Sequence, residues 1–140
     1  MNEYRFEDIK LGLEEEFKVD ITEEMIELFC KITGDINPLH NDLEYAKSKG
    51  YKEKVVYGML TSSFLSTLAG VYLPGKYSLI HSVEVLFKKP VFISDSPLTI
   101  RGKVIEINEI FKQITISVEV INKKNEKVLR GTMKVGVLDE

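Results

Sequence analysis

The segment from Met59 to Gly70 restricts the folds open to this chain more than any other feature. Its apolar side chains occupy most of the helical circumference, and only small Ser and Thr residues lie between them. A helix without a charged face is typically buried on all sides. We therefore expect a central helix around which the remaining elements pack. Its apolar residues are Met59, Leu60, Phe64, Leu65, Leu68 and Ala69.

The composition changes to strands after Ser78. Apolar and other side chains alternate with a period of two, which is typical of half-buried strands. The connections between these segments are short, and Asn122–Asn125 forms a polar hairpin turn, so antiparallel pairing is favoured. Four strands are therefore predicted, within residues 83–87, 98–104, 114–120 and 131–137.

The first third of the chain predicts one strand and two shorter helices. Alternation over Glu14–Asp20 suggests a strand at a sheet edge. Thr22 is a suitable N-cap for a helix that ends at Gly34, and Asn41 or Asp42 can cap a second helix that runs through Ser48. The apolar face of the first helix is formed by Met25, Leu28, Phe29 and Ile32. The residues between Asp35 and His40 are expected to form a loop.

These elements predict an α+β fold in which one antiparallel sheet curls around the buried helix. At 140 residues the chain fits a single domain, residues 1–140, that buries a core without disulfides or metal. Cys30 is the only cysteine, so internal disulfides and the usual zinc patterns are excluded, and a cytoplasmic location fits best. We expect no cofactor.

Charge and hydropathy limit the classes of binding partner that this chain is expected to have. The chain has 19 Lys and Arg residues against 22 Asp and Glu residues, without a basic cluster interleaved with aromatics, so nucleic acid is not expected as a partner. The N-terminus lacks the apolar run of a secretory signal, and no segment approaches the length of a membrane span. We therefore expect no membrane partner.

The stretch Thr33–Ala46 carries the candidate chemistry. Asp35 and His40 lie five residues apart on a segment stiffened by Gly34 and Pro38. A carboxylate and an imidazole held in this way can share one water as base and acid. The competing interpretation is a capping carboxylate and a histidine whose hydrogen bonds are satisfied by the backbone.

The same stretch resembles the signature of the MaoC-like dehydratases, which include the (R)-specific enoyl-CoA hydratases. A Gly-Met-Leu segment follows at the expected interval, and the resemblance continues through Leu73–Gly75 and Phe87–Phe92 to cover nearly the whole chain. The matching residues of the signature are Thr33, Gly34, Asp35, Asn37, Pro38, His40 and Ala46, followed by Gly58, Met59 and Leu60.

The resemblance implies a hot-dog fold, in which an antiparallel sheet wraps a central helix, and a homodimer whose two sheets become continuous. It also implies reversible syn addition of water to a trans-2-enoyl thioester, which gives the (R)-3-hydroxyacyl product. The implied carrier is coenzyme A.

The resemblance assigns Asp35 and His40 as the catalytic pair that positions water and transfers protons. Asn37 corresponds to a polar residue that orients the water or the pair, although an Asx turn before Pro38 explains it equally well. The N–H of Gly58, at the start of the buried helix, could stabilise the enolate oxygen. The alternative for Gly58 is a glycine that permits the turn. Ser62 could hydrogen-bond the carboxylate or pack beside the loop.

The chain departs from the family at Tyr57, where many members have His. This departure concerns the acyl tunnel, for which Tyr57, Met59 and Phe64 are candidate lining residues. Lys88 and Lys89 either meet coenzyme A phosphates or are solvated lysines at a strand end.

Three other functions fit the same residues. The first is dehydration of a 3-hydroxyacyl group on acyl carrier protein, or of one pathway-specific acyl group. The second is thioester hydrolysis, and the third is binding of acyl thioesters without catalysis.

Overall fold

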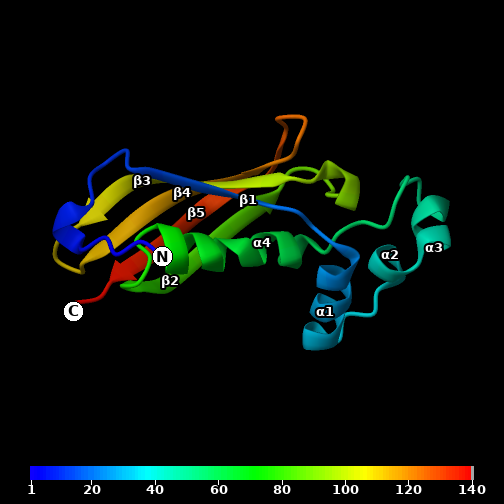
Figure 1. Ribbon diagram of the computed structural model, residues 1–140, viewed down its shortest axis with the longest axis horizontal. Coiled ribbons are helices and arrows are strands. Elements are labelled where there is room, and N and C mark those ends of the chain that lie inside the picture. The colour runs from blue at the N-terminus through cyan, green and yellow to red at the C-terminus, as the bar shows by residue number, and fades with distance from the viewer. Residues whose placement is uncertain (140) are drawn as a thin grey trace.

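The protein is described by a computed structural model in which residues 1–139 are placed (Figure 1). Five strands form one antiparallel sheet in the order β1-β3-β4-β5-β2. The first and second strands of the chain are therefore the two edges, as predicted for the first. The strands are β1 (Glu14–Val19), β2 (Ser78–Phe87), β3 (Leu98–Asn108), β4 (Gln113–Ile121) and β5 (Lys127–Val137).

The predicted central helix is α4 (Gly58–Thr67), which continues as a π-helical turn over Leu68–Tyr72. It lies along one face of the sheet (Figure 1), and Leu65 and Leu68 are fully buried beneath the strands. Gly102 of β3 allows this close packing, since a Cβ there would lie 2.9 Å from side-chain atoms of Leu68 and Ile116. The sheet wrapped around one helix confirms the expected α+β, hot-dog architecture.

Three short helices lie beyond one end of the sheet (Figure 1): α1 (Glu23–Thr33), α2 (Pro38–Asn41) and α3 (Leu43–Ser48). The predicted cap of α1 is confirmed, because Thr22 accepts a hydrogen bond from the Met25 N–H at 3.2 Å. Gly34 ends α1 in the left-handed conformation, with φ +75°. These helices carry the Asp35–His40 segment alongside the start of α4.

The expectation of a plain loop between Asp35 and His40 is wrong, because α2 begins within it. Asn37 is the N-cap and Pro38 is the first helical residue, a combination that favours helix initiation. The helix is a single turn, too short to produce a hydrophobic period. His40 therefore projects from a helix and not from a loop.

Two apolar surfaces remain open in the folded chain. The predicted apolar face of α1 is only partly covered, because Met25 and Phe29 pack against the core whereas Leu28 is exposed and Ile32 is 81% exposed. The second surface is edge strand β2. Its exposed apolar residues are Leu79, Ile80, Val83, Leu86 and Phe87. Within residues 1–139, no helix has the length and apolar character to cross a membrane.

Candidate active site

Asp35 is held at the start of α2 by side-chain hydrogen bonds to the backbone. Its N–H donates to Thr33 Oγ1 at 3.2 Å, and its Oδ1 accepts from the Asn37 N–H at 3.0 Å. Asn37 Oδ1 in turn accepts from the Leu39 N–H at 2.9 Å. These consecutive turns explain why Thr, Asp and Asn occur at this spacing. They leave the second oxygen of the exposed Asp35 carboxylate for a ligand.

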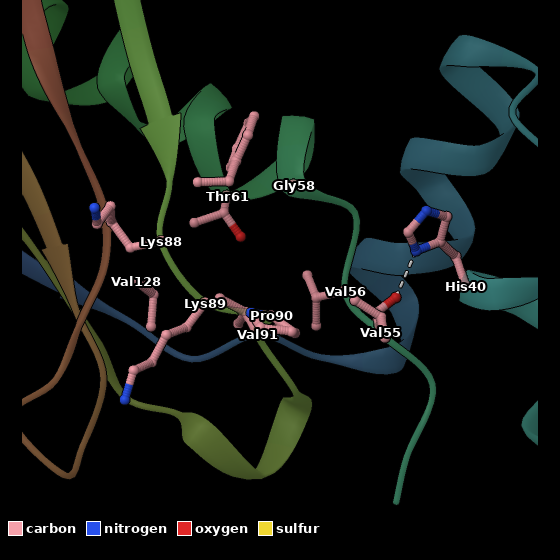
Figure 2. A pocket seen from close by; sticks show the side chains of 11 residues that line it. His40, Val55, Val56, Gly58, Thr61, Lys88, Lys89, Pro90, Val91 and Val128 are labelled. Carbon is pink, nitrogen blue, oxygen red and sulfur yellow. Dashed lines mark hydrogen bonds between the residues drawn. The ribbon is translucent and has the colours of Figure 1, made fainter. Parts of the chain in front are cut away.

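His40 is half-buried, and one of its ring nitrogens is engaged. Nδ1 lies 2.6 Å from the carbonyl oxygen of Val55, the contact drawn as a dashed line in Figure 2. Because a carbonyl can only accept, Nδ1 must carry the hydrogen of this bond. The neutral imidazole therefore has Nε2 as an acceptor, and this nitrogen can take up or return a proton.

Tyr57 connects the two candidate residues. Its side chain is only 2% exposed, its hydroxyl donates to the carbonyl oxygen of Asp35, and it accepts from Asn41 Nδ2 at 2.9 Å. Its ring centroid lies 4.1 Å from that of His40 and 4.9 Å from that of Phe29. Burial raises the pKa of Tyr57, so the hydroxyl keeps its hydrogen at neutral pH.

Gly58 is the first residue of α4, so its N–H has no acceptor within the helix. A Cβ at this position would lie 3.0 Å from the ring of Phe87, closer than most real contacts. Gly58 does not adopt a positive φ. The alternative of a glycine that only permits the turn is therefore not supported, whereas the close contact with Phe87 leaves little room for a larger side chain.

These residues border one open groove of about 630 Å³, a size suited to a small-molecule ligand. Acidic and imidazole groups face it together with the start of α4, and aromatic rings complete its walls. The arrangement can hold a polar reacting centre against an apolar surface. Its lining residues are Phe29, Thr33, Asp35, His40, Tyr57, Gly58, Met59 and Phe87.

Comparison with known proteins identifies the family. The profile described as "MaoC like domain" matches residues 6–126. The chain belongs to the MaoC-like domain family. An (R)-specific enoyl-CoA hydratase of Rhodospirillum rubrum is 36% identical over 104 residues, which are 72% of each chain. A 3-hydroxybutyryl-CoA dehydratase of Methylorubrum extorquens is 33% identical over 90 residues, or 64% of this chain and 57% of that one.

Solved structures agree with the fold of this MaoC-like domain. The (R)-hydratase from A. caviae, described as involved in PHA biosynthesis, superposes with a TM-score of 0.88. It is 26% identical, and the match covers 92% of this chain and 97% of that structure.

Some of the candidate site residues do not line the groove of this MaoC-like domain. Asn37 serves as the cap of α2, consistent with the Asx interpretation. Ser62 Oγ donates to the carbonyl oxygen of Met59 at 3.0 Å, within its own helix, and Phe64 packs against the core. Tyr57 and Met59 do line the groove.

Sequence reasoning missed several residues of the site. The sequence indicates Thr33 only as part of the signature, Phe29 as part of a helix face and Phe87 as a strand residue. The sequence predicts Asn41 only as a cap, although it lies four residues after Asn37 and donates to that residue's carbonyl oxygen at 3.0 Å. Within residues 1–139, no group of three or more His, Cys, Asp or Glu side chains is arranged to hold a metal ion.

Proposed function

We propose that this MaoC-like domain adds water to the C2=C3 bond of a trans-2-enoyl thioester and gives the (R)-3-hydroxyacyl thioester, or catalyses the reverse dehydration. The observation that carries the proposal is the shared groove, in which Asp35 and His40 face the start of α4. Family membership and the named activities of two relatives support the same chemistry. The domain would therefore be a carbon-oxygen lyase.

Asp35 and His40 act together on one water molecule. The free carboxylate oxygen and His40 Nε2 hold the water, one of the pair removes its proton, and the water oxygen bonds to C3. The electron pair of the C2=C3 bond moves toward the thioester oxygen, and C2 then receives a proton from the pair. Positioned proton transfer of this kind contributes about 10² to 10⁴ in rate.

The start of α4 supplies the stabilisation of the enolate. The N–H of Gly58 donates to the thioester oxygen as negative charge develops on it. A single donor of this type is worth about 2.7 to 4 kcal/mol in the transition state. The positive end of the helix dipole acts in the same direction.

The substrate is bound as a thioester of coenzyme A, the carrier named for both curated relatives. Dehydration on acyl carrier protein uses the same pair and differs only in what docks beside the groove. The single Cys30 fits a reducing compartment, so we place the reaction in the cytoplasm.

We further propose a homodimer that pairs through β2. Among the described residues this strand pairs only with β5, so its other edge is unpaired, and the strand carries the exposed apolar side chains noted above. An unpaired apolar edge is a template for another strand. A two-fold axis beside β2 would join two sheets into one and bring the partner next to the groove through Phe87.

The proposal is tested with crotonyl-CoA. Hydration is followed as loss of the enoyl-thioester absorbance, and the product is oxidised with an (R)-specific 3-hydroxyacyl dehydrogenase. We expect (R)-3-hydroxybutyryl-CoA from the wild-type protein, and formation at least about 10²-fold slower from Asp35→Asn. Release of free thiol without hydration would contradict the proposal and favour thioester hydrolysis.

A further inference from the structure

Asn41 has a side chain that neither the fold nor the proposed mechanism explains. The sequence offers Asn41 or Asp42 as the N-cap of α3, and in the structure the cap is Asp42, whose Oδ1 accepts from the Tyr45 N–H at 3.1 Å. Asn41 is exposed and lies at the last position of α2, next to His40. An exposed asparagine without a capping role does not need a fixed conformation. The amide of Asn41 is nevertheless bound at two points.

Both hydrogens of the Asn41 amide nitrogen are used. Nδ2 donates to the carbonyl oxygen of Asn37 at 3.0 Å, within α2, and to the hydroxyl oxygen of Tyr57 at 2.9 Å, at the N-cap of α4. The same Asn37 oxygen accepts from the His40 N–H at 3.1 Å. Rotation of the amide by a half turn would place Oδ1 against this oxygen, and two acceptors repel each other. The nitrogen is therefore the amide atom that faces Tyr57.

The amide in turn fixes the direction of the Tyr57 O–H. A phenolic hydroxyl has one hydrogen, and because its oxygen accepts from Asn41, this hydrogen must point elsewhere. The carbonyl oxygen of Asp35 receives it. The Cys30 thiol also lies beside the hydroxyl, but sulfur is a weak acceptor compared with a carbonyl oxygen. The hydrogen bonds therefore run in one direction, from Asn41 through Tyr57 to Asp35.

The bond from Tyr57 is one of three that hold Asp35. The Asp35 N–H donates to Thr33 Oγ1 at 3.2 Å, and Oδ1 accepts from the Asn37 N–H at 3.0 Å. Both of these bonds lie within the turn itself, so they shape the turn without placing it against the rest of the molecule. The Tyr57 hydroxyl comes from outside the turn. It therefore sets where the Asp35 carboxylate lies relative to the start of α4.

His40 is joined to the segment before α4 by separate contacts. Its Nδ1 donates to the carbonyl oxygen of Val55 at 2.6 Å, the bond drawn in Figure 2, and the Val55 N–H donates to the Leu39 carbonyl oxygen at 3.1 Å. Neither contact involves the side chain of Asn41. The position of the imidazole is thus independent of Asn41, whereas the position of the carboxylate depends on the hydroxyl that Asn41 orients.

We propose that Asn41 is a positioning residue for the reaction: its amide directs the Tyr57 hydroxyl to the Asp35 carbonyl and so holds the carboxylate in place opposite His40. Asn41 acts through Tyr57 and takes no part in proton transfer. This inference rests on the proposed function, because it concerns the placement of a group that transfers protons. Neither Asn41 nor Tyr57 is among the matching residues of the family signature, so the resemblance does not supply this role.

The test is a double-mutant cycle of Asn41→Leu and Tyr57→Phe, measured as kcat and KM for crotonyl-CoA. Asn41→Leu removes both N–H donors. In the wild-type background we expect kcat to fall about 3- to 10-fold, as for one net hydrogen bond, with KM changed by less than about twofold. In the Tyr57→Phe background the same substitution should change kcat by less than about twofold, because the hydroxyl through which Asn41 acts is absent.

Ser48→Ala is the matched control for the loss of a bond to the residue's own helix. It removes the hydrogen bond from Ser48 Oγ to the Tyr45 carbonyl oxygen at 2.6 Å on α3, and it should behave as wild type. If Asn41 served only to close α2 through its bond to Asn37, its substitution would lower kcat by the same factor in both backgrounds, and this result would overturn the proposal. Wild-type kcat in Asn41→Leu would overturn it as well. A rise in KM with unchanged kcat would reject it in favour of a contact with substrate.

A spectroscopic measurement separates this inference from the proposed function, because it does not depend on turnover. The resonance of the isotopically labelled Asp35 carbonyl carbon reports the hydrogen bond from Tyr57. Asn41→Asp keeps the shape of the side chain, but a carboxylate only accepts, so the Tyr57 hydroxyl turns to it and releases the Asp35 carbonyl. We expect this resonance to move in the same direction in Asn41→Asp and in Tyr57→Phe.

Asn108→Asp is the control for the added charge. It lies at the end of β3, where its side-chain oxygen accepts from the N–H groups of Ile110 and Phe111, a role that a carboxylate can keep. The Asp35 resonance should not move in this variant. A resonance that moves in Tyr57→Phe but not in Asn41→Asp would overturn the proposal even if the enzyme is fully active. The expected pattern in a protein that does not hydrate crotonyl-CoA would support the orienting role of Asn41 and reject only the proposed function.

Discussion

Replacing Tyr57 with Phe tests how the catalytic pair is held in place. The variant loses only the hydroxyl, while the ring can keep its contacts with His40 and Phe29. Two hydrogen bonds disappear, one to the Asp35 carbonyl and one from Asn41. At about 0.5 to 1.5 kcal/mol net for each bond, the loss is about 1 to 3 kcal/mol. The lower half of this range applies, because Asn41 still donates to Asn37 and water can reach the exposed Asp35.

The expected functional effect is on kcat. Without the hydroxyl, the Asp35 backbone loses its tie to the residue that packs against His40, so only the bonds with Thr33 and Asn37 still hold the carboxylate in position. Misplacement of a reacting group by about 1 Å can cost about 10² in rate. We expect kcat for crotonyl-CoA to fall about 10- to 100-fold, with KM changed by less than about threefold, because few binding contacts are removed.

The assay combines steady-state kinetics with urea unfolding at equilibrium. Tyr45→Phe is the control, since Tyr45 lies on α3 at the surface and should lose neither stability nor activity. Wild-type kcat in Tyr57→Phe, together with the expected loss of stability, would refute the positioning role. It would leave Tyr57 as a packing residue that also borders the groove.

Three further results are expected. Asp35→Asn and His40→Ala should each lower hydration of crotonyl-CoA by at least about 10²-fold with unchanged circular dichroism, whereas near-normal turnover would remove that residue from the mechanism. Gly58→Ala should push the Phe87 ring aside and lower kcat/KM more than tenfold, and recovery in the double variant with Phe87→Ala would identify the ring contact as the cause. Val83→Glu on β2 should convert a dimer into monomers in light scattering, and a wild-type protein already monomeric at micromolar concentration would contradict the proposed assembly.

The main elements of the fold could be predicted because each has a local signal. Met59–Gly70 lacks charge, and the strands alternate over enough residues to reveal a period of two. The π-helical turn at Leu68–Tyr72 has no such signal, and α2 is only one turn long. Strand order also depends on pairing between distant residues, so the sequence supported antiparallel pairing but not which strand lies beside which.

The candidate site likewise contains residues that the sequence predicts and contacts that it does not. Asp35 and His40 lie close in sequence, so their spacing predicts that they face one region. The contacts of Tyr57 with Asp35 and of Gly58 with Phe87 join segments that are 22 and 29 residues apart. No sequence pattern in these segments predicts that they are in contact. Helical spacing makes Ser62 a candidate partner of the carboxylate, with packing beside the loop as the alternative, and in the structure its hydroxyl bonds the carbonyl of Met59.

The position of Phe87 links the proposed association of subunits to the binding of substrate in the groove. It is the last residue of edge strand β2, and its ring rests on the glycine proposed to bind the thioester oxygen. In the proposed dimer, pairing of β2 with a second chain and occupation of the groove would therefore both act on the same ring. Thermodynamic linkage requires the effect to be reciprocal: if association strengthens substrate binding by some factor, substrate strengthens association by the same factor. The affinity of the subunits for one another would then report the occupancy of the groove.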